Sequence, residues 1–347
     1  MNTGNRKAQV ESGLLQIWYG GHKPSLIVGL SLSLLELIYK SLRWVSRQNK
    51  KSAAAKKACR PPVLVIGNLI AGGAGKTPIV MAVCQHFLAN GQQVGIVSRG
   101  YGRSAQTPML IDPAQTLPAA SEVGDEPLFL SHETGCPVAV CADRSQAVNL
   151  LLRHFPDLSL IVSDDGLQHH RLARQLEWVV FDSRAHGNGR LLPAGPLREP
   201  LARLDSVDAV LCSNIAPQVL SKALNRPVQN NWHAIQVQLT GFSQLSSGLF
   251  LTIDQAKEHW KGLKLVAFTG MGNPEKLFAA LRSAGLNLDA SHGLPDHFNY
   301  PEDFCSQFIQ QVLITSGKDA VKLDHSNPKV WVAEISVTLP PALTQAL

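Results

Sequence analysis

The chain has 347 residues, of which 45% are hydrophobic and 17% charged, which excludes an intrinsically disordered protein and predicts about two domains. Residues 1–60 hold eleven Lys and Arg against two acids, a net charge of +9, whereas the remaining residues hold 21 against 24, a net charge of −3. The overall charge of +6 therefore belongs to the N-terminus, and no nucleic-acid partner is expected for the body of the protein. The six cysteines form no CxxC pair and show no zinc spacing, which is typical of a reducing compartment.

The first predicted element is the apolar segment LIVGLSLSLLELIY at residues 26–39, which is shorter than the roughly 20 residues that a membrane-spanning helix needs. Aromatic residues flank the segment, and cations follow it: Trp18, Tyr19, Tyr39 and Trp44, then Lys40, Arg43, Arg47, Lys50, Lys51, Lys56 and Lys57. An apolar face with interfacial aromatics and trailing cations favours a helix that lies in an anionic membrane surface. A core helix of the globular body and a single membrane span are the alternatives.

A nucleotide-binding loop follows. Residues 63–66 form a short apolar strand of the buried parallel kind, and a helical pattern runs over residues 79–89. The glycine-rich stretch between them is expected to bind ATP through Ile70, Ala71, Gly72, Gly73, Ala74, Gly75, Lys76 and Thr77. In such a loop the backbone amides surround the phosphates, the lysine reaches the β- and γ-phosphates, and the threonine hydroxyl binds Mg²⁺. The strict GxxxxGK[ST] pattern has a glycine where Ile70 stands, and a glycine-rich turn without a ligand is the alternative.

A metal-binding carboxylate is predicted at the end of a second apolar strand, residues 158–162, which runs into Ser163-Asp164-Asp165-Gly166. Either Asp164 or Asp165 is expected to hold Mg²⁺, directly or through water. A further strand at residues 94–97 leads into the loop SRGYGR at residues 98–103. Its glycines and arginines favour a mobile loop that faces an anion.

The second half of the chain repeats the order strand, turn, helix, with strands predicted at residues 265–268 and 312–315 and a helix that begins at Pro274. The expected fold class is α/β: a P-loop NTPase-type parallel sheet flanked by helices, a second smaller α/β domain and an N-terminal membrane-surface helix. The predicted segments are a membrane-associating N-terminus, a P-loop kinase core, an inter-domain crossing and a C-terminal α/β domain, at residues 1–60, 61–215, 216–250 and 251–347.

Eight blocks between about residues 63 and 323 carry a family resemblance: GNLIAGGAGKTP, VSRGYGR, VGDEP, DDGLQH, LLPAGPLREP, TGMGNPEKLF, PDHFNY and SGKDAVKL. In this order they resemble the tetraacyldisaccharide 4′-kinases, which phosphorylate the 4′-hydroxyl of a tetraacylated glucosamine disaccharide 1-phosphate in lipid A synthesis. That family also lacks the first glycine of the loop. The resemblance implies a phosphotransferase with an alcohol acceptor that uses ATP and Mg²⁺. It also implies a peripheral or monotopic protein at the cytoplasmic face of the bacterial inner membrane, with no obligate protein partner.

The resemblance further implies individual roles. Asp125 would accept the proton of the sugar hydroxyl with the help of His297, and Lys76 would complete the catalytic set. Contacts to nucleotide, sugar or 1-phosphate would come from Tyr101, His169, Arg198 and Glu199. At His297 the chain departs from the family, which often has a second histidine in that block. On local sequence alone, an N-cap of a helix before Glu126-Pro127 is the better interpretation of Asp125.

The alternative function is a membrane-associated P-loop NTPase switch, in a binding and signalling class. Guanine specificity usually leaves an Asn-Lys-x-Asp sequence at a strand end, and residues 212–214 and 316–319 each match only part of it. Nucleotide turnover distinguishes the two, because a switch hydrolyses GTP slowly without an acceptor and a kinase requires the acceptor.

Overall fold

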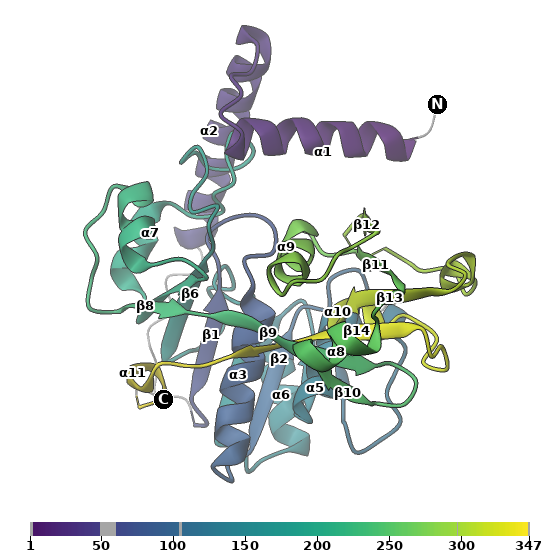
Figure 1. The fold of residues 1–347 in the computed structure, drawn as a ribbon. Coiled ribbons are helices and arrows are strands. Elements are labelled where there is room, and N and C mark those ends of the chain that lie inside the picture. The colour runs from purple at the N-terminus through teal and green to yellow at the C-terminus, as the bar shows by residue number, and fades with distance from the viewer. Residues whose placement is uncertain (1–2, 49–59, 104–105, 297, 346–347) are drawn as a thin grey trace. The chain divides into compact units, whose positions relative to one another are not determined.

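The computed structural model describes residues 3–48, 60–103, 106–296 and 298–345 (Figure 1). The chain divides into two compact units, and each is built from two separate stretches of sequence. The first unit comprises Met1–Gly75 and Asp165–Ile235, and the second comprises Lys76–Asp164 and Gln236–Leu347. Residues that are distant in sequence therefore meet inside each unit.

The first unit begins with two long helices, α1 (Thr3–Tyr19) and α2 (Leu26–Gln48). Its four strands run parallel in the order β1-β6-β7-β8, with bounds Val63–Gly67, Leu176–Phe181, Ala209–Ser213 and Trp232–Ile235. Every residue of β1 and β7 is buried, which is the reason for their continuous apolar sequences. Helix α7 (Pro217–Leu224) contacts β8, and a short 3-10 helix, η1 (Leu201–Ser206), precedes β7 (Figure 1).

The second unit contains the strand order β3-β4-β2-β5, with β3 antiparallel to β4 and the other pairs parallel. The bounds are Met109–Ile111 for β3, Val138–Val140 for β4, Val94–Ser98 for β2 and Leu160–Asp164 for β5. Four helices accompany them: α3 (Lys76–Ala89), α4 (Ala120–Val123), α5 (Asp125–Thr134) and α6 (Arg144–His154). Helix α3 packs on β2, β5 and α5, so its first turn lies in contact range of α5.

A second sheet of six strands belongs to the same unit, in the order β10-β9-β14-β13-β11-β12. The strand bounds are Val237–Gln244 (β9), Phe250–Thr252 (β10), Lys264–Thr269 (β11), Ala290–Gly293 (β12), Gln311–Ser316 (β13) and Val330–Val337 (β14). The remaining elements are α8 (Ile253–His259), α9 (Glu275–Ser283), η2 (Phe304–Gln307), α10 (Gly317–Ala320) and α11 (Pro341–Thr344). One apolar cluster of this sheet includes Trp260, whose ring packs edge-on against the rings of Phe242 and Trp331. The ring centroids are 4.9 and 5.3 Å apart, respectively.

The predicted fold class is confirmed: the chain is α/β, with a large parallel sheet flanked by helices and a second sheet. The predicted inter-domain crossing at residues 216–250 contains α7, β8 and β9, and the second sheet begins at Val237. The division of the chain into four segments stays a prediction.

Helix α2 extends from Leu26 to Gln48, beyond the predicted apolar segment. Its large apolar residues are strongly exposed, among them Leu26 (80%), Ile27 (78%), Leu30 (64%) and Leu34 (61%). The alternative of a core helix is therefore wrong. Across the described ranges, no helix combines the length and the apolar character that crossing a membrane requires.

Candidate active site

The glycine-rich loop joins β1 to α3 and is held by its own side chains. Gly72 and Gly75 have φ angles of +88° and +84°, a conformation that favours glycine. The fully buried Asn68 donates its side-chain amide to the carbonyl of Gly72 at 2.9 Å, which closes the start of the loop. Residues of the loop and its immediate neighbours therefore determine the loop conformation.

Ile70, which stands where the strict motif has glycine, is fully buried and forms an antiparallel bridge with Leu197. Two backbone hydrogen bonds flank that bridge: Ala71 N donates to Pro196 O at 2.7 Å, and Arg198 N donates to Leu69 O at 2.6 Å. A buried residue in such an extended pairing is stabilised by an apolar side chain and does not need the conformational freedom of glycine. The tertiary pairing with residues 196–198 thus explains the departure from the motif.

Lys76 and Thr77 are the first two residues of α3, where unpaired backbone amides and the helix dipole favour a phosphate. Lys76 is only 9% exposed. The hydroxyl of Thr77 donates a hydrogen bond to Glu126 Oε1 at 2.7 Å, so its lone pairs stay available to a cation. Glu126 was not predicted as a site residue, although it lies in the block VGDEP that carried the resemblance.

The two acidic residues at the end of β5 differ in their surroundings. Asp164 is the last residue of the strand and only 2% exposed. Asp165 has a left-handed φ of +48°, and its carboxylate accepts from Arg198 Nη1 at 2.9 and 3.2 Å. Arg198 therefore lies next to one of the two predicted metal-binding carboxylates.

Carboxylate and hydroxyl oxygens are the donors that Mg²⁺ prefers, so Thr77 and the Asp164–Asp165 pair fit this ion. Among the described residues, no cluster of three or more His, Cys, Asp or Glu side chains could hold a metal on its own.

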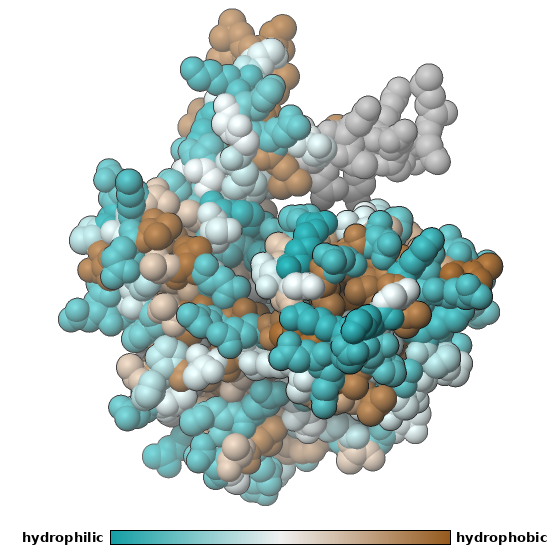
Figure 2. All heavy atoms as spheres, in the orientation of Figure 1, coloured by the Kyte–Doolittle hydropathy of each residue, from teal (hydrophilic) through white to brown (hydrophobic). Residues whose placement is uncertain are grey.

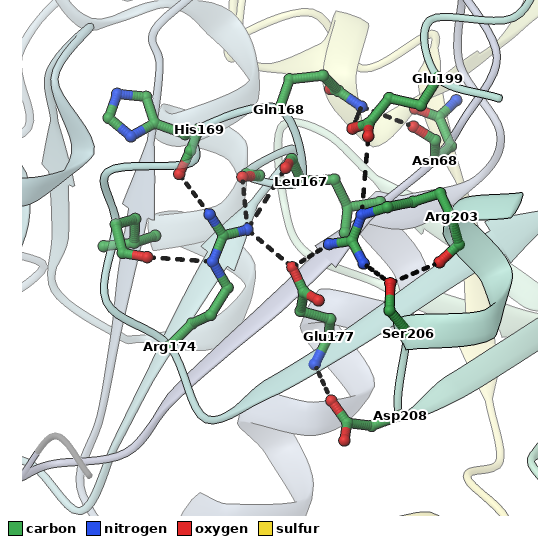
Figure 3. Close-up of polar contacts among 12 residues, drawn as sticks. Asn68, Leu167, Gln168, His169, Arg174, Glu177, Glu199, Arg203, Ser206 and Asp208 are labelled. Atoms are coloured by element: carbon green, nitrogen blue, oxygen red, sulfur yellow. Dashed lines mark hydrogen bonds and ion pairs between the residues drawn. The ribbon is translucent and has the colours of Figure 1, made fainter. Parts of the chain in front are cut away.

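Glu199 is buried, at 1% exposure, within a network of charged side chains (Figure 3). Its carboxylate accepts from Arg43 Nη2 at 2.8 Å and from Gln168 Nε2 at 3.3 Å, and Arg203 lies 3.7 Å away. Arg203 in turn contacts Glu177 of β6, which also binds Arg174 at 2.9 Å.

Arg174 donates hydrogen bonds to the main-chain carbonyls of Gly166, Leu167 and His169, which lie in the DDGLQH block, and to that of Leu172. The carbonyl of His169 is therefore part of the network in Figure 3. A contact of its imidazole with nucleotide, sugar or 1-phosphate stays a prediction. This buried ion network fixes the backbone that follows Asp165, because removing one partner would leave a buried charge uncompensated.

Asp125 is the first residue of α5 and is 5% exposed. The alternative that it caps the helix is wrong: the N-cap residue is Gly124, which has a φ of +94°, and no side chain caps this end. The Asp125 carboxylate lies 3.5 Å from Lys322 Nζ, and its Oδ1 accepts from the backbone amide of Glu126 at 2.9 Å.

The SRGYGR loop packs against residues 123–124, which directly precede α5. A Cβ placed on Gly100 would lie 2.7 Å from the carbonyl of Val123, and one on Gly124 would lie 3.2 Å from the carbonyl of Tyr101. The absence of side chains at both positions lets the two predicted blocks approach closely. The side chain of Tyr101 itself is 66% exposed.

Two lysines of the block SGKDAVKL, Lys318 and Lys322, also lie near the start of α5. Neither was predicted as a site residue. Gly317 at the start of α10 packs so closely on the ring of Phe129 in α5 that a Cβ there would overlap it. This contact brings α10 against α5 and places Lys322 beside Asp125. Burial alone would lower the pKa of Lys318, but the carboxylates of Glu126, Asp125, Asp296 and Asp319 raise it above its usual value.

Asp319 is the centre of a hydrogen-bond network beside these two lysines. Its carboxylate is 1% exposed and accepts from Thr269 Oγ1 at 2.6 Å, Ser316 Oγ at 2.6 Å and Tyr300 Oη at 2.9 Å. Lys322 lies 3.4 Å from it and donates to the carbonyl of Phe298 at 3.0 Å. His297 lies outside the described residues, although its neighbour Asp296 pairs with Lys318 at 3.5 Å.

A buried parallel strand, a glycine loop, Lys-Thr at the start of a helix and a carboxylate at the end of a second strand define a P-loop protein of the phosphoryl-transfer class. The family model described as tetraacyldisaccharide-1-P 4′-kinase, LpxK, matches residues 28–347. The chain belongs to this family. The predicted class of enzyme, an ATP- and Mg²⁺-dependent phosphotransferase of lipid A synthesis, is confirmed by that membership.

Relatives agree over most of their length. The chain is 38% identical over 329 residues to a tetraacyldisaccharide 4′-kinase of Acidovorax sp. (strain JS42), covering 94% of this chain and 91% of the relative. It is 40% identical over 280 residues to the one of Bordetella petrii, covering 80% and 78%. The fold is similar to a crystal structure of LpxK from Aquifex aeolicus in complex with ATP, with a TM-score of 0.72, 24% identity and coverage of 92% and 97%.

Proposed function

We propose that this chain transfers the γ-phosphate of ATP to the 4′-hydroxyl of an acylated glucosamine disaccharide 1-phosphate. The observation that carries the proposal is the pairing of Thr77 at the start of α3 with Glu126, the residue next to Asp125. This hydrogen bond supports the proposal because it links the end of the loop to the residue next to the predicted proton acceptor, within one unit. Phosphoryl transfer to an alcohol requires both functions in one site.

Lys76 and the amides of residues 72–77 bind the β- and γ-phosphates of ATP in this proposal. Ile70 and Ala71 hold the start of the loop instead, because the Ala71 amide donates to Pro196 O. Thr77 and the Asp164–Asp165 pair hold Mg²⁺, which when bound neutralises charge on the transferring phosphoryl group. Arg198, paired with Asp165 at 2.9 Å, restricts the orientation of that carboxylate and adds positive charge beside it.

Asp125 accepts the proton of the sugar hydroxyl, and His297 assists it. A buried carboxylate is a suitable acceptor when a cation holds its orientation and charge, and Lys322 at 3.5 Å is such a cation. Asp296 and Phe298, on either side of His297, contact Lys318 and Lys322.

Tyr101 and Arg198 are accessible enough to touch substrate, with Tyr101 66% exposed and the Arg198 side chain 27% exposed. His169 is proposed to contribute through the backbone that Arg174 holds. Glu199 is fully enclosed by Arg43, Arg203 and Gln168, so its contribution is exerted through these partners.

The membrane surface is the proposed location of the acceptor, at the cytoplasmic face of the inner membrane. Hydrophobic atoms gather at the top of Figure 2, over the first turns of α2. Exposed leucines and isoleucine on α2 would enter the lipid, and their burial contributes about 25 cal/mol per Å² of apolar surface. Arg43, expected among the membrane-facing cations, is instead paired with the buried Glu199, and Lys40 bridges to Glu36 at 3.0 Å.

Incubation of the full chain with ATP, Mg²⁺ and detergent-dispersed disaccharide 1-phosphate tests the proposal. The expected result is a second phosphate on the lipid, with ATP preferred to GTP and little hydrolysis in the absence of acceptor. Lys76→Ala should reduce the rate on the order of 10²–10³-fold, because the loop then lacks its cation. Lys264→Ala, a change of an exposed lysine on β11, is the matched control. Acceptor-independent GTP hydrolysis would instead support the NTPase switch.

A further inference from the structure

One face of helix α2 is fastened to the segment of residues 190–199. Glu36, which is 6% exposed, accepts from Arg190 at 2.7 Å and from the backbone amide of Leu191 at 3.2 Å. Arg190 also donates to Ser33 Oγ at 2.9 Å. The first half of α2 is therefore held by a buried carboxylate with several partners, a stronger attachment than an exposed ion pair.

Two further contacts follow one and two turns later on the same face. The hydroxyl of Tyr39 donates to the carbonyl of Arg198 at 2.9 Å, and Arg43 binds the carboxylate of Glu199 at 2.8 Å. Residues 36, 39 and 43 recur at a helical spacing of three and four, which places them on one side of α2. None of them is among the exposed apolar residues of the helix.

The opposite side of the same segment forms the wall of the nucleotide loop. Leu197 bridges Ile70, and backbone hydrogen bonds join Pro196 to Ala71 and Arg198 to Leu69. The side chain of Arg198 binds Asp165. The segment that carries α2 thus also carries the start of the loop and one of the two predicted metal carboxylates.

A line of hydrogen bonds connects Arg43 to a loop glycine. Glu199, which binds Arg43, accepts from Gln168 Nε2 at 3.3 Å, and the same amide donates to the carbonyl of Asn68 at 3.2 Å (Figure 3). Asn68 in turn donates to the carbonyl of Gly72 at 2.9 Å. Arg43 is the member of this line that lies on α2, so it is the residue through which the helix is connected to the loop.

We infer that α2 is a structural part of the nucleotide site, and that Arg43 is a positioning residue that acts through Glu199 and Gln168 on the glycine loop. The inference rests on the proposed binding of ATP phosphates by that loop. A helix that serves only to attach the protein to lipid affects how much enzyme reaches the substrate. A helix that orders the loop affects ATP binding even when no membrane is present.

The test measures steady-state kinetics of the full-length protein on detergent-dispersed disaccharide 1-phosphate, with ATP and lipid varied separately. Arg43→Ala is expected to raise the KM for ATP about tenfold while the KM for lipid stays within about twofold, because the lost charge-assisted bond orders only the loop. Arg43→Lys should recover part of the loss, since it restores the charge without the planar guanidinium. Lys23→Gln removes one positive charge at an exposed residue just before the same helix and should leave both constants unchanged.

Two additional variants keep the test decisive if Arg43→Ala folds poorly. Glu199→Gln should raise the KM for ATP on its own and should be strongly non-additive with Arg43→Ala, because both break one connection. Tyr39→Phe deletes only the hydroxyl that binds Arg198 and should give a smaller change of the same kind. Unfolding midpoints measured in parallel identify variants whose kinetic change results from reduced stability of the fold.

The outcomes separate the inference from the proposed function. If Lys76→Ala keeps full activity, the loop does not bind ATP and the proposed function fails. If Lys76→Ala is inactive and Arg43→Ala has wild-type constants in detergent with reduced activity on vesicles, α2 is an attachment element and the inference is overturned.

Discussion

The hydroxyl of Thr77 donates a hydrogen bond to Glu126 across 2.7 Å, from the first turn of α3 to the first turn of α5. Because the hydroxyl hydrogen is committed to Glu126, the oxygen lone pairs face away from that carboxylate. Such a partner orients a metal-binding group, and its removal typically costs 10- to 100-fold in metal affinity or activity.

Glu126→Ala is therefore expected to raise the Mg²⁺ concentration that gives half-maximal activity by about tenfold or more. Glu126→Gln keeps an oxygen acceptor and should show a smaller rise. A titration of activity against Mg²⁺ at saturating ATP measures both, with Glu133→Gln on the same helix as the control. An unchanged Mg²⁺ dependence in Glu126→Ala would show that the Thr77 contact has no part in metal binding.

Asp125→Asn and His297→Ala should each lower kcat by roughly 10²–10⁴-fold, the range for loss of a general acid–base group. Residues that act as one unit are non-additive, so the double variant should lose much less than the product of the two effects. Single-turnover rates at saturating ATP and lipid provide the comparison. Full additivity would separate the two residues and leave Asp125 with a structural role at the start of α5.

Lys322→Met should reduce kcat about tenfold with both KM values unchanged, because Lys322 holds the orientation of Asp125 at 3.5 Å. It should also lower the free energy of unfolding by roughly 1–3 kcal/mol, since the buried carboxylates of Asp125 and Asp319 lose a cation. Lys261→Met is the matched control: its partner Glu258 lies at a similar 3.4 Å, but both side chains are largely exposed. A Lys322→Met enzyme with wild-type kcat would show that Asp125 is positioned by other contacts.

Exposed apolar residues of α2 should carry the salt-resistant part of membrane binding, because burial in acyl chains does not depend on ionic strength. High salt should release the protein from pelleted membranes only in part, and detergent should release it fully. The double variant Leu30→Glu/Leu34→Glu should increase the soluble fraction while turnover on detergent-dispersed substrate stays near wild type. Val219→Glu, an equally exposed site on α7, is the control. A wild-type chain that stays in the supernatant at low salt would refute membrane attachment through α2.

The glycine loop shows what local sequence determines. The apolar run before it predicts a buried strand that the structure extends by one residue to Gly67, and Lys76-Thr77 mark the start of the following helix. These features depend on contiguous residues, on the φ angles that glycine permits and on hydrophobic patterning, all of which are visible in the sequence. The predicted strands before Asp164 and within the second half were likewise found within two residues of their positions.

The partners of the site residues were decided only by the tertiary structure. Nothing near Ile70 in the sequence indicates that Leu197 pairs with it, and nothing near Asp125 indicates Lys322, because each pair joins segments that the chain brings together after long excursions. The same holds for Arg43, which composition assigns to a cationic membrane-facing stretch and which the fold pairs with the buried Glu199. A charge in a sequence has no fixed partner; long-range packing and the cost of leaving a buried carboxylate uncompensated select one.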